Sequence, residues 1–308
     1  MDSEQLSFFA DNGKNNKPPK KEKIKTVISV SRRTDIPAFY YKWLQDALKR
    51  QEIEIANPMF PAKKYIVDLR PEKVHSIVLW SKDFSNVAKD PGLLTYYNLY
   101  FQYTINNYSR LLEPNVPEYN SSIKTLELLL KKYKPEQFNI RFDPIIISSQ
   151  CEPMPAPQDP IKERLNIFKQ LCGDIKSLGL DRCKVTTSYI SFYGHVLQRM
   201  RQSGIEMLYM DQAEQMEFFE DMADIADKYN IKLYSCASPL IEKVKGISRG
   251  HCIDGKLLIS LFGGSVSLQK DKGQRADCCC TLSKDIGSYS NGVSAKECLH
   301  GCRYCYVR

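Results

Sequence analysis

The segment TVISVSRRTDIPAFYYKWLQDALKR (residues 26–50) contains the pattern that decides the fold. It begins with a short β-rich run, TVISVS (26–31), and continues through a charged turn into a helical stretch (38–50) that follows Pro37. Proline suits the first turn of a helix, because its missing amide hydrogen would have no intrahelical partner there. The segment therefore predicts a strand followed by a helix, the unit that is repeated in parallel α/β proteins.

Further β-rich runs follow along the chain, and helical patterns separate them. The runs are SIVLWS (76–81), LYFQYTIN (99–106), QFNIRFDPIII (137–147), CKVTTSYI (183–190) and IKLYSCAS (231–238). Helical patterns with one apolar face span residues 121–133, 160–178 and 212–229. No G-x-G-x-x-G follows the first run, so the usual dinucleotide fingerprint is missing. We predict an α/β fold, a partial, TIM-like (β/α) barrel of about six parallel strands whose two faces are both covered.

Composition divides the chain into three segments. Residues 1–23 are polar and basic and are expected to be a disordered tail, residues 24–262 form the partial barrel, and residues 263–308 form a cysteine-rich, metal- or cluster-binding segment packed on it. The chain is 43% hydrophobic and 26% charged, a balance typical of a globular core. It has neither a long apolar run nor a secretory signal, so we expect a cytoplasmic protein without a membrane partner.

The charge balance and the tail both favour an anionic partner. Lys and Arg exceed Asp and Glu by 44 to 36, a net charge of +8, which predicts an anionic small molecule or nucleic acid as ligand. The tail segment Gln5-Leu6-Ser7-Phe8-Phe9 resembles the peptide by which bacterial DNA-handling proteins dock on the replication sliding clamp. The alternative interpretation of this segment is a chance run of apolar residues.

Charged residues gather where the predicted strands end. Ligands of parallel α/β proteins bind at the carboxyl ends of strands, and Arg and Lys there would bind carboxylate or phosphate. The candidate catalytic residues are Arg32, Arg33, Asp35, Lys82, Arg141 and Asp143. The alternative is a buried ion network, in which the arginines pair with Asp35, Asp83 or Asp143 and only close the mouth of the barrel.

The cysteines are unevenly distributed. Six of the 11 fall within the last 31 residues: Cys278, Cys279, Cys280, Cys298, Cys302 and Cys305. In a reducing compartment such a group indicates metal binding rather than disulfides. The other five are Cys151, Cys172, Cys183, Cys236 and Cys252, and they are expected to be small buried apolar residues.

The last three cysteines form a C-x3-C-x2-C motif with Tyr304 before the final cysteine. This motif resembles the cluster motif of radical-SAM enzymes, and its YCY ending is similar to that of the spore photoproduct lyases, which repair DNA. The resemblance implies a 4Fe–4S cluster with one iron open to S-adenosylmethionine, Tyr304 on the cofactor side, and a lyase or transferase reaction. His300, inside the motif, is expected to be an exposed loop residue.

Other metal chemistries remain open. Zinc bound by Cys280, Cys298, Cys302 and Cys305 would make a closed structural site. A fully ligated 4Fe–4S cluster would use Cys278 or Cys280 as its fourth ligand. Either would suit a non-catalytic, zinc- or iron–sulfur-stabilised protein that binds nucleic acid or a phosphate-bearing ligand.

Several motifs together resemble an uncharacterised bacterial family, domain of unknown function 1848, over about residues 26–308. They are SVSRRTDIPAFY, WSKD, QYTIN, LEPNVP, RFDPIII, SKDIGSY, HGCRYCY and the pair Cys278 and Cys280. The resemblance marks the charged strand-end residues above, Ser31 (a candidate cofactor-binding residue) and the cysteines, with Cys279 as a bystander. Radical-SAM enzymes carry their cysteine loop after the first strand, whereas here it comes last. We therefore expect the tail to fold back over the mouth and bring Cys302 near Arg33 and Arg141.

Overall fold

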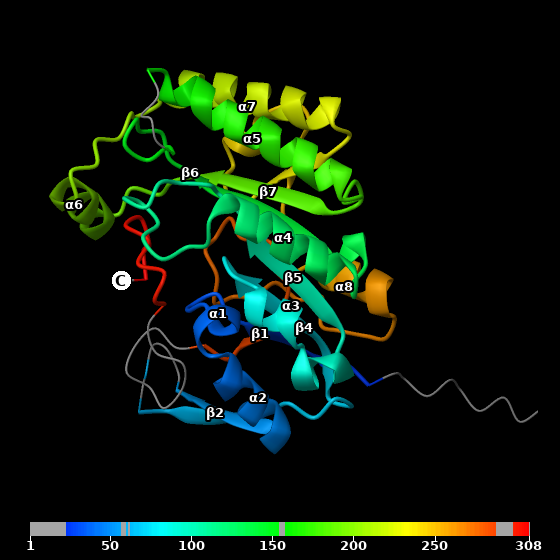
Figure 1. The fold of residues 1–308 in the computed structure, drawn as a ribbon. Helices are drawn as coiled ribbons and strands as arrows, with labels where there is room; N and C mark the ends of the chain where they lie inside the picture. The colour runs from blue at the N-terminus through cyan, green and yellow to red at the C-terminus, as the bar shows by residue number, and fades with distance from the viewer. Residues whose placement is uncertain (1–22, 57–59, 61, 154–157, 288–297, 308) are drawn as a thin grey trace, which may run out of the picture.

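The computed structural model describes residues 23–56, 60, 62–153, 158–287 and 298–307, and its centre is an eight-stranded parallel sheet (Figure 1). The strands are β1 (Thr26–Val30), β4 (Val74–Ser81), β5 (Leu99–Thr104), β6 (Phe138–Ile145), β7 (Lys184–Tyr189), β8 (Lys232–Ser235), β9 (Ile247–Arg249) and β10 (Lys284–Asp285). Their order is β10-β1-β4-β5-β6-β7-β8-β9, so β9 and β10 are edges and the barrel is not closed. The predicted α/β fold is confirmed, with two short edge strands added to the six expected.

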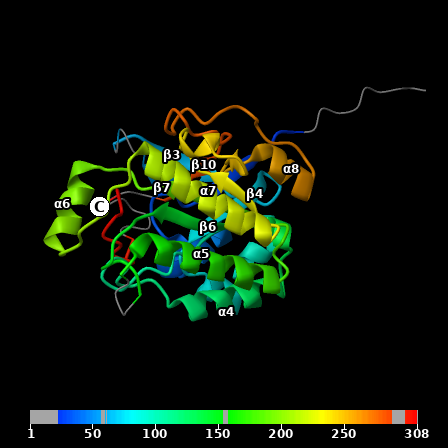
Figure 2. The ribbon, with the colours of Figure 1, turned by 90° about the horizontal axis from the view of Figure 1, so that it is seen from above.

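Helices connect the strands and lie on both sides of the sheet. They are α1 (Ile36–Phe39), α2 (Tyr41–Arg50), α3 (Ser85–Lys89), α4 (Tyr119–Leu130), α5 (Pro160–Ser177), α6 (Gly194–Gln202), α7 (Gln212–Lys228) and α8 (Gly255–Phe262), with 3-10 turns η1 (Gly92–Tyr96), η2 (Pro135–Gln137) and η3 (Ile241–Lys243). α5 and α7 lie side by side (Figures 1 and 2). The helix expected over 38–50 is two helices, because the backbone of Tyr40 (φ −127°, ψ 30°) leaves the helical conformation. An antiparallel hairpin, β2 (Glu52–Ala56) with β3 (Lys64–Asp68), follows α2.

The two faces of the sheet differ in what they bury. Ile28, Ile77 and Phe101 belong to the main apolar core, which includes residues of α5 and α7. Their neighbours Val27, Val78 and Tyr100 belong to a second cluster with the segment around α8, which therefore fills the inner face. The apolar runs thus form strands that are covered on both faces, as expected.

Polar side chains fasten this inner segment to the strands. Thr186 donates to Oδ1 of Asn139 (2.8 Å), and Asn139 donates to Oε1 of Gln102 (2.7 Å). Gln102 in turn donates to the main-chain carbonyl of Cys252. Lys184 forms an ion pair with Asp254 (2.9 Å). Four strand residues in this way hold residues 252–254 in place.

The end of the chain returns to the carboxyl ends of the strands. β10 pairs with β1, and residues 298–307 then lie beside α6 in both views (Figures 1 and 2). Arg199 of α6 donates to the carbonyl of Cys305 (2.7 Å), which fixes this contact. The sliding-clamp-like segment 5–9 and nearly all of the expected disordered tail lie outside the described residues. Within the described residues, no helix is long and apolar enough to cross a bilayer.

Candidate functional site

A cavity of about 480 Å³ opens at the carboxyl ends of the strands. Every site residue named from the sequence lines it: Ser31, Arg32, Arg33, Asp35, Lys82, Arg141, Asp143, Cys278, Cys280, Cys298, Cys302, Tyr304 and Cys305. Two cysteines that were expected to be ordinary core residues, Cys236 and Cys252, line it as well. The tail thus brings Cys302 into the same cavity as Arg33 and Arg141, although its cysteine loop comes last in the sequence.

His300 anchors the cysteine loop to the first strand-end turn. Its side chain is 1% exposed, and its Nε2 lies 2.7 Å from Oδ2 of Asp35. Its Nδ1 lies 3.1 Å from the carbonyl oxygen of Asn115. Asp35 also accepts hydrogen bonds from the Ser81 hydroxyl (2.7 Å) and the Lys82 amide (2.8 Å). The expectation of an exposed loop histidine is therefore wrong, because the loop folds inward and places the imidazole between buried Asp35 and the carbonyl of Asn115.

Glu113 forms a second anchor, which the sequence analysis did not single out. Its carboxylate is almost fully buried and accepts from Lys82 Nζ (2.6 Å), the Tyr304 hydroxyl (2.5 Å) and Asn106 Nδ2 (3.3 Å). Burial by itself would raise the pKa of Glu113, but the charge of Lys82 and these hydrogen bonds lower it. Glu113 lies in the motif LEPNVP, which was the only signal for it in the sequence.

The three motif cysteines interact with one another across the cavity wall. Cys302 is 6% exposed, and burial raises the pKa of its thiol while Lys82 opposes this shift. Burial, followed by the charge of Asp35, raises the pKa of Cys298 to about 11. Both thiols interact electrostatically with Cys305. Three thiols that face one open cavity suit a metal cluster held on one side only, with its remaining side toward the cavity.

Cys278 and Cys280 belong to a different group of thiols. Cys280 interacts through its side chain with Cys252 and with Cys278, and the Sγ atoms of Cys252 and Cys236 lie 3.3 Å apart. Cys278 and Cys280, the alternative fourth ligands of the terminal motif, thus interact with Cys252 and Cys236. The five cysteines outside the tail were expected to be core residues, yet two of them join this group because residues 251–253, after β9, form hydrogen bonds with residues 279–281, which lead to β10.

No group of three or more His, Cys, Asp or Glu side chains in the described ranges already has the arrangement of a metal site. Within each of the two groups, the thiols instead interact with other thiols of the same group. Rotation about χ1 of a cysteine moves its sulfur without moving the backbone, so side-chain rotation could aim these thiols at a shared ion.

The charged residues of the mouth are largely paired. Arg141 pairs with Asp143, as the ion-network alternative predicts, and its Nη1 also donates to Sγ of Cys252 (3.0 Å). Arg32 bonds to Asp271 (3.2 Å) and lies 3.7 Å from Asp285, two carboxylates that the sequence did not indicate. Arg33, Asp83 and Asp35 form other contacts: Arg33 donates to the carbonyl of Gly287 (3.0 Å), Asp83 accepts from the amide of Ser85 (2.8 Å), and Asp35 contacts His300 (2.7 Å).

Asp285 organises the turn that carries these arginines. Its carboxylate accepts from Ser29 (2.7 Å), Ser31 (2.6 Å) and the amide of Arg32 (2.9 Å). The motif SKDIG therefore acts through a strand beside β1, where the close approach of Gly287 to Ser31 leaves no room for a Cβ. Ser31 thus helps to position the turn through its bond to Asp285, and it also lines the cavity.

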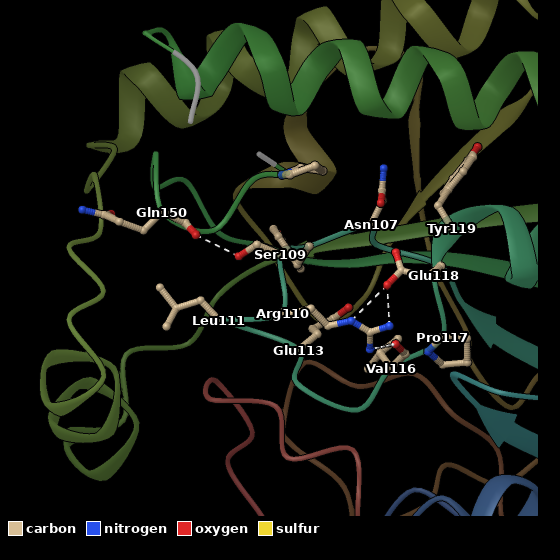
Figure 3. Close-up of a pocket in the computed structure, with 12 residues that line it drawn as sticks. Asn107, Ser109, Arg110, Leu111, Glu113, Val116, Pro117, Glu118, Tyr119 and Gln150 are labelled. Atoms are coloured by element: carbon tan, nitrogen blue, oxygen red, sulfur yellow. Dashed lines mark hydrogen bonds and ion pairs between the residues drawn. The ribbon is translucent and has the colours of Figure 1, made fainter. Parts of the chain in front are cut away.

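A second cavity, of about 500 Å³, lies around residues 107–119 (Figure 3). Its prominent charged pair, Arg110 with Glu118, is exposed, and such pairs contribute about 0–1 kcal/mol. Its lining in the described chain includes Glu113 but no cysteine. The cysteine-lined cavity is therefore the better candidate for a functional site.

Comparisons with known proteins identify a family. A Bacteroides thetaiotaomicron protein of known crystal structure, provisionally described as an alpha-L-fucosidase, aligns with 94% of this chain and 93% of its own, at 11% identity and a TM-score of 0.34, which is too low to support an argument. No curated protein matches the chain. The model of the family described as "Domain of unknown function (DUF1848)" matches residues 27–307. This match spans nearly the whole described chain and confirms the resemblance found in the motifs, so the protein belongs to the DUF1848 family.

Proposed function

We propose that this protein is an iron–sulfur enzyme of the radical-SAM type, with Cys298, Cys302 and Cys305 as the ligands of a 4Fe–4S cluster. The observation that supports this most is that all three thiols line one cavity at the carboxyl ends of the parallel strands, where such folds bind their ligands. A reduced cluster of this kind supplies the one-electron cleavage of S-adenosylmethionine to a 5′-deoxyadenosyl radical.

The surrounding residues have defined tasks under this proposal. His300 and Glu113 hold the cysteine loop at two points, through Asp35 and Tyr304, so that the thiols keep a fixed position relative to the strands. Lys82, whose charge interacts with Cys302, offsets the negative charge of the thiolates. The side of the cluster that faces the cavity is left for S-adenosylmethionine and the substrate.

The substrate is expected to be anionic, with nucleic acid as one candidate, and the reaction to be that of a lyase or transferase. Tyr189, Tyr193 and Tyr306 line the cavity, and aromatic rings of this kind stack on nucleobases. We also expect a cytoplasmic location, because seven reduced thiols around one cavity suit a reducing compartment.

One observation favours a second candidate, a metal-stabilised binding protein without catalysis. Arg32, Arg141 and Lys82 each have a carboxylate partner, so less positive charge is available to a ligand than the sequence suggests. In this alternative, metal at the terminal motif would contribute mainly folding energy.

Anaerobic reconstitution with iron and sulfide tests the two candidates. We expect a brown protein in which the terminal motif accounts for about four irons and that reductively cleaves S-adenosylmethionine. Cys302→Ala should lose that iron and the cleavage, whereas Cys279→Ser, a control at a thiol outside both groups, should keep them. A colourless protein that takes up zinc at the terminal motif and leaves S-adenosylmethionine intact would reject the first candidate and support the second.

A further inference from the structure

Four cysteines from three separate segments meet on the side of the cavity away from the terminal motif. Cys236 follows β8, Cys252 follows β9, and Cys278 and Cys280 precede β10. Gly250 allows the segment after β9 to approach the end of β8. Its amide donates to the carbonyl of Ser235 (2.7 Å), and a Cβ on Gly250 would lie 2.4 Å from that oxygen. The absence of a side chain therefore lets the end of β9 close against the end of β8 and bring Cys252 to Cys236.

One short contact and several further interactions link the thiols of this group. The Sγ atoms of Cys236 and Cys252 lie 3.3 Å apart, Cys252 interacts with Cys280, and Cys280 interacts with Cys278. Cys278 also interacts electrostatically with Cys236, so these interactions include every member of the group. Cys279 lies between two members in sequence, but its sulfur is directed to the carbonyl of Asp277 (3.8 Å), outside the group.

We propose that Cys236, Cys252, Cys278 and Cys280 form a second metal centre, which holds one tetrahedral ion, typically zinc, through four thiolates. Sulfurs that share one tetrahedral zinc lie about 3.8 Å apart, since each Zn–S bond is about 2.3 Å. The 3.3 Å between Cys236 and Cys252 is close to this value. Cysteines that hold a 4Fe–4S cube bind different irons and stand farther apart, so the spacing favours a single ion.

The surroundings match the charge of such a centre. Four thiolates around a divalent ion carry a net charge of −2, which must be offset when the site is buried. Nη1 of Arg141 donates to Sγ of Cys252 (3.0 Å), and Arg32 interacts electrostatically with Cys280. The amide of Ile253 also donates to Sγ of Cys280 (3.3 Å). Partners of this kind orient metal ligands and tune the metal, as outer-shell hydrogen bonds do in known sites.

The position of the group gives the centre a structural role. β9 is one edge of the eight-stranded sheet and β10 is the other, and the four cysteines join the segments beside both edges. An ion held there would fasten the open side of the barrel where hydrogen bonds between strands do not close it. The centre is independent of the terminal motif, so it does not rest on the proposed iron–sulfur chemistry.

Metal analysis of crossed variants tests this inference on the full-length chain, purified without oxygen. In Cys302→Ala, which removes a ligand of the terminal motif only, we expect one tightly bound ion per chain to remain. Cys252→Ser and Cys278→Ser should lose it, and Cys279→Ser should keep it. Growth with cobalt should give the intense visible absorption of tetrahedral thiolate-bound Co(II), again lost in the first two variants and kept in the third.

If the serine variants fold poorly, a protection experiment on the wild-type protein tests the same inference. Alkylation of the native wild-type protein should spare these four thiols while the ion is bound and label them after a strong chelator is added. A stoichiometric Cys236–Cys252 disulfide, equal metal loss in Cys279→Ser, or four irons that persist in Cys302→Ala and vanish in Cys252→Ser would each overturn the single-ion centre. None of these outcomes depends on whether S-adenosylmethionine is cleaved.

Discussion

Nε2 of His300 lies 2.7 Å from Oδ2 of Asp35, and this contact joins the last turn of the chain to the loop after its first strand. The two residues are separated by 265 positions in sequence, and both are buried. The edge of the His300 ring also packs against Phe39 of α1, with ring centroids 4.6 Å apart. This imidazole is thus one of the anchors that set where the cysteine loop lies relative to the carboxyl ends of the strands.

Replacing His300 with Ala should loosen this loop without unfolding the sheet. Asp35 would keep its bonds to Ser81 and Lys82 but lose a buried partner, a loss of about 1–3 kcal/mol. We expect a lower melting temperature and a marked fall in iron retained by the reconstituted protein. His195→Ala, which removes only an exposed contact between α6 and the carbonyl of Tyr306 (3.2 Å), beyond the last motif cysteine, is the comparison. Unchanged iron content in the His300 variant would show that the loop is held in another way.

The Lys82–Glu113 pair gives a second prediction. Both side chains are largely buried, so Lys82→Met would leave the Glu113 carboxylate without its cation, at a loss of about 3–5 kcal/mol in the free energy of unfolding. The double variant Lys82→Met with Glu113→Gln should recover much of that loss, because no uncompensated charge remains. Chemical denaturation of the single and double variants measures both. If Lys82→Met is as stable as wild type and only weakens ligand binding, Lys82 serves the ligand rather than the fold.

Gly287 allows a prediction with a designed rescue. A Cβ at this position would lie 1.9 Å from Oγ and 2.5 Å from Cβ of Ser31, so Gly287→Ala should force β10 from β1 and destabilise the protein by about 1–3 kcal/mol. Adding Ser31→Gly removes both clashing atoms and should restore part of the loss. Gly194→Ala is a matched control, because a methyl group at that position would have nothing within 4 Å of it. Melting temperatures that do not separate Gly287→Ala from Gly194→Ala would contradict the close approach.

The sequence predicted the centre of the sheet well and its edges poorly. Six apolar runs of six to 11 residues correspond to β1 and β4 to β8, because a strand covered on both faces leaves a long apolar signal. β9 and β10 have three and two residues, too few for any periodicity. Their places depend on hydrogen bonds to β8 and β1, which local sequence does not encode.

The same reason explains which site residues were foreseen. Arg141 and the terminal cysteines carry a local signal, because a strand end or a fixed spacing is visible within a few positions. The grouping of Cys236 and Cys252 with Cys280 depends on the approach of segments that lie beside opposite edges of the sheet, and each cysteine by itself has the appearance of a core residue. Asp285 and Glu113 are single acidic residues whose partners come from distant strands and loops, so only the folded chain identifies them.

A buried ion pair outside the site predicts a pH dependence of stability. Arg164 of α5 and Glu152 are both fully buried, with Nη2 2.9 Å from Oε2, yet burial outweighs the arginine and raises the pKa of Glu152 from 4.5 to about 7. Between these values the folded chain holds a proton that the unfolded chain has released. The stability that the folded chain gains from this protonated Glu152 is therefore complete below about pH 4.5 and is lost as the pH rises through about 7.

Glu152→Gln removes this titration and isolates its effect. Relative to wild type, the melting temperature of the variant should increase from pH 5 to pH 8, because only the wild-type side chain becomes an anion in the buried site. Glu127→Gln, at an exposed carboxylate of α4, should show no such trend and serves as the control. A melting-temperature difference between Glu152→Gln and wild type that stays constant over this range would mean that Arg164 keeps the Glu152 carboxylate ionised throughout.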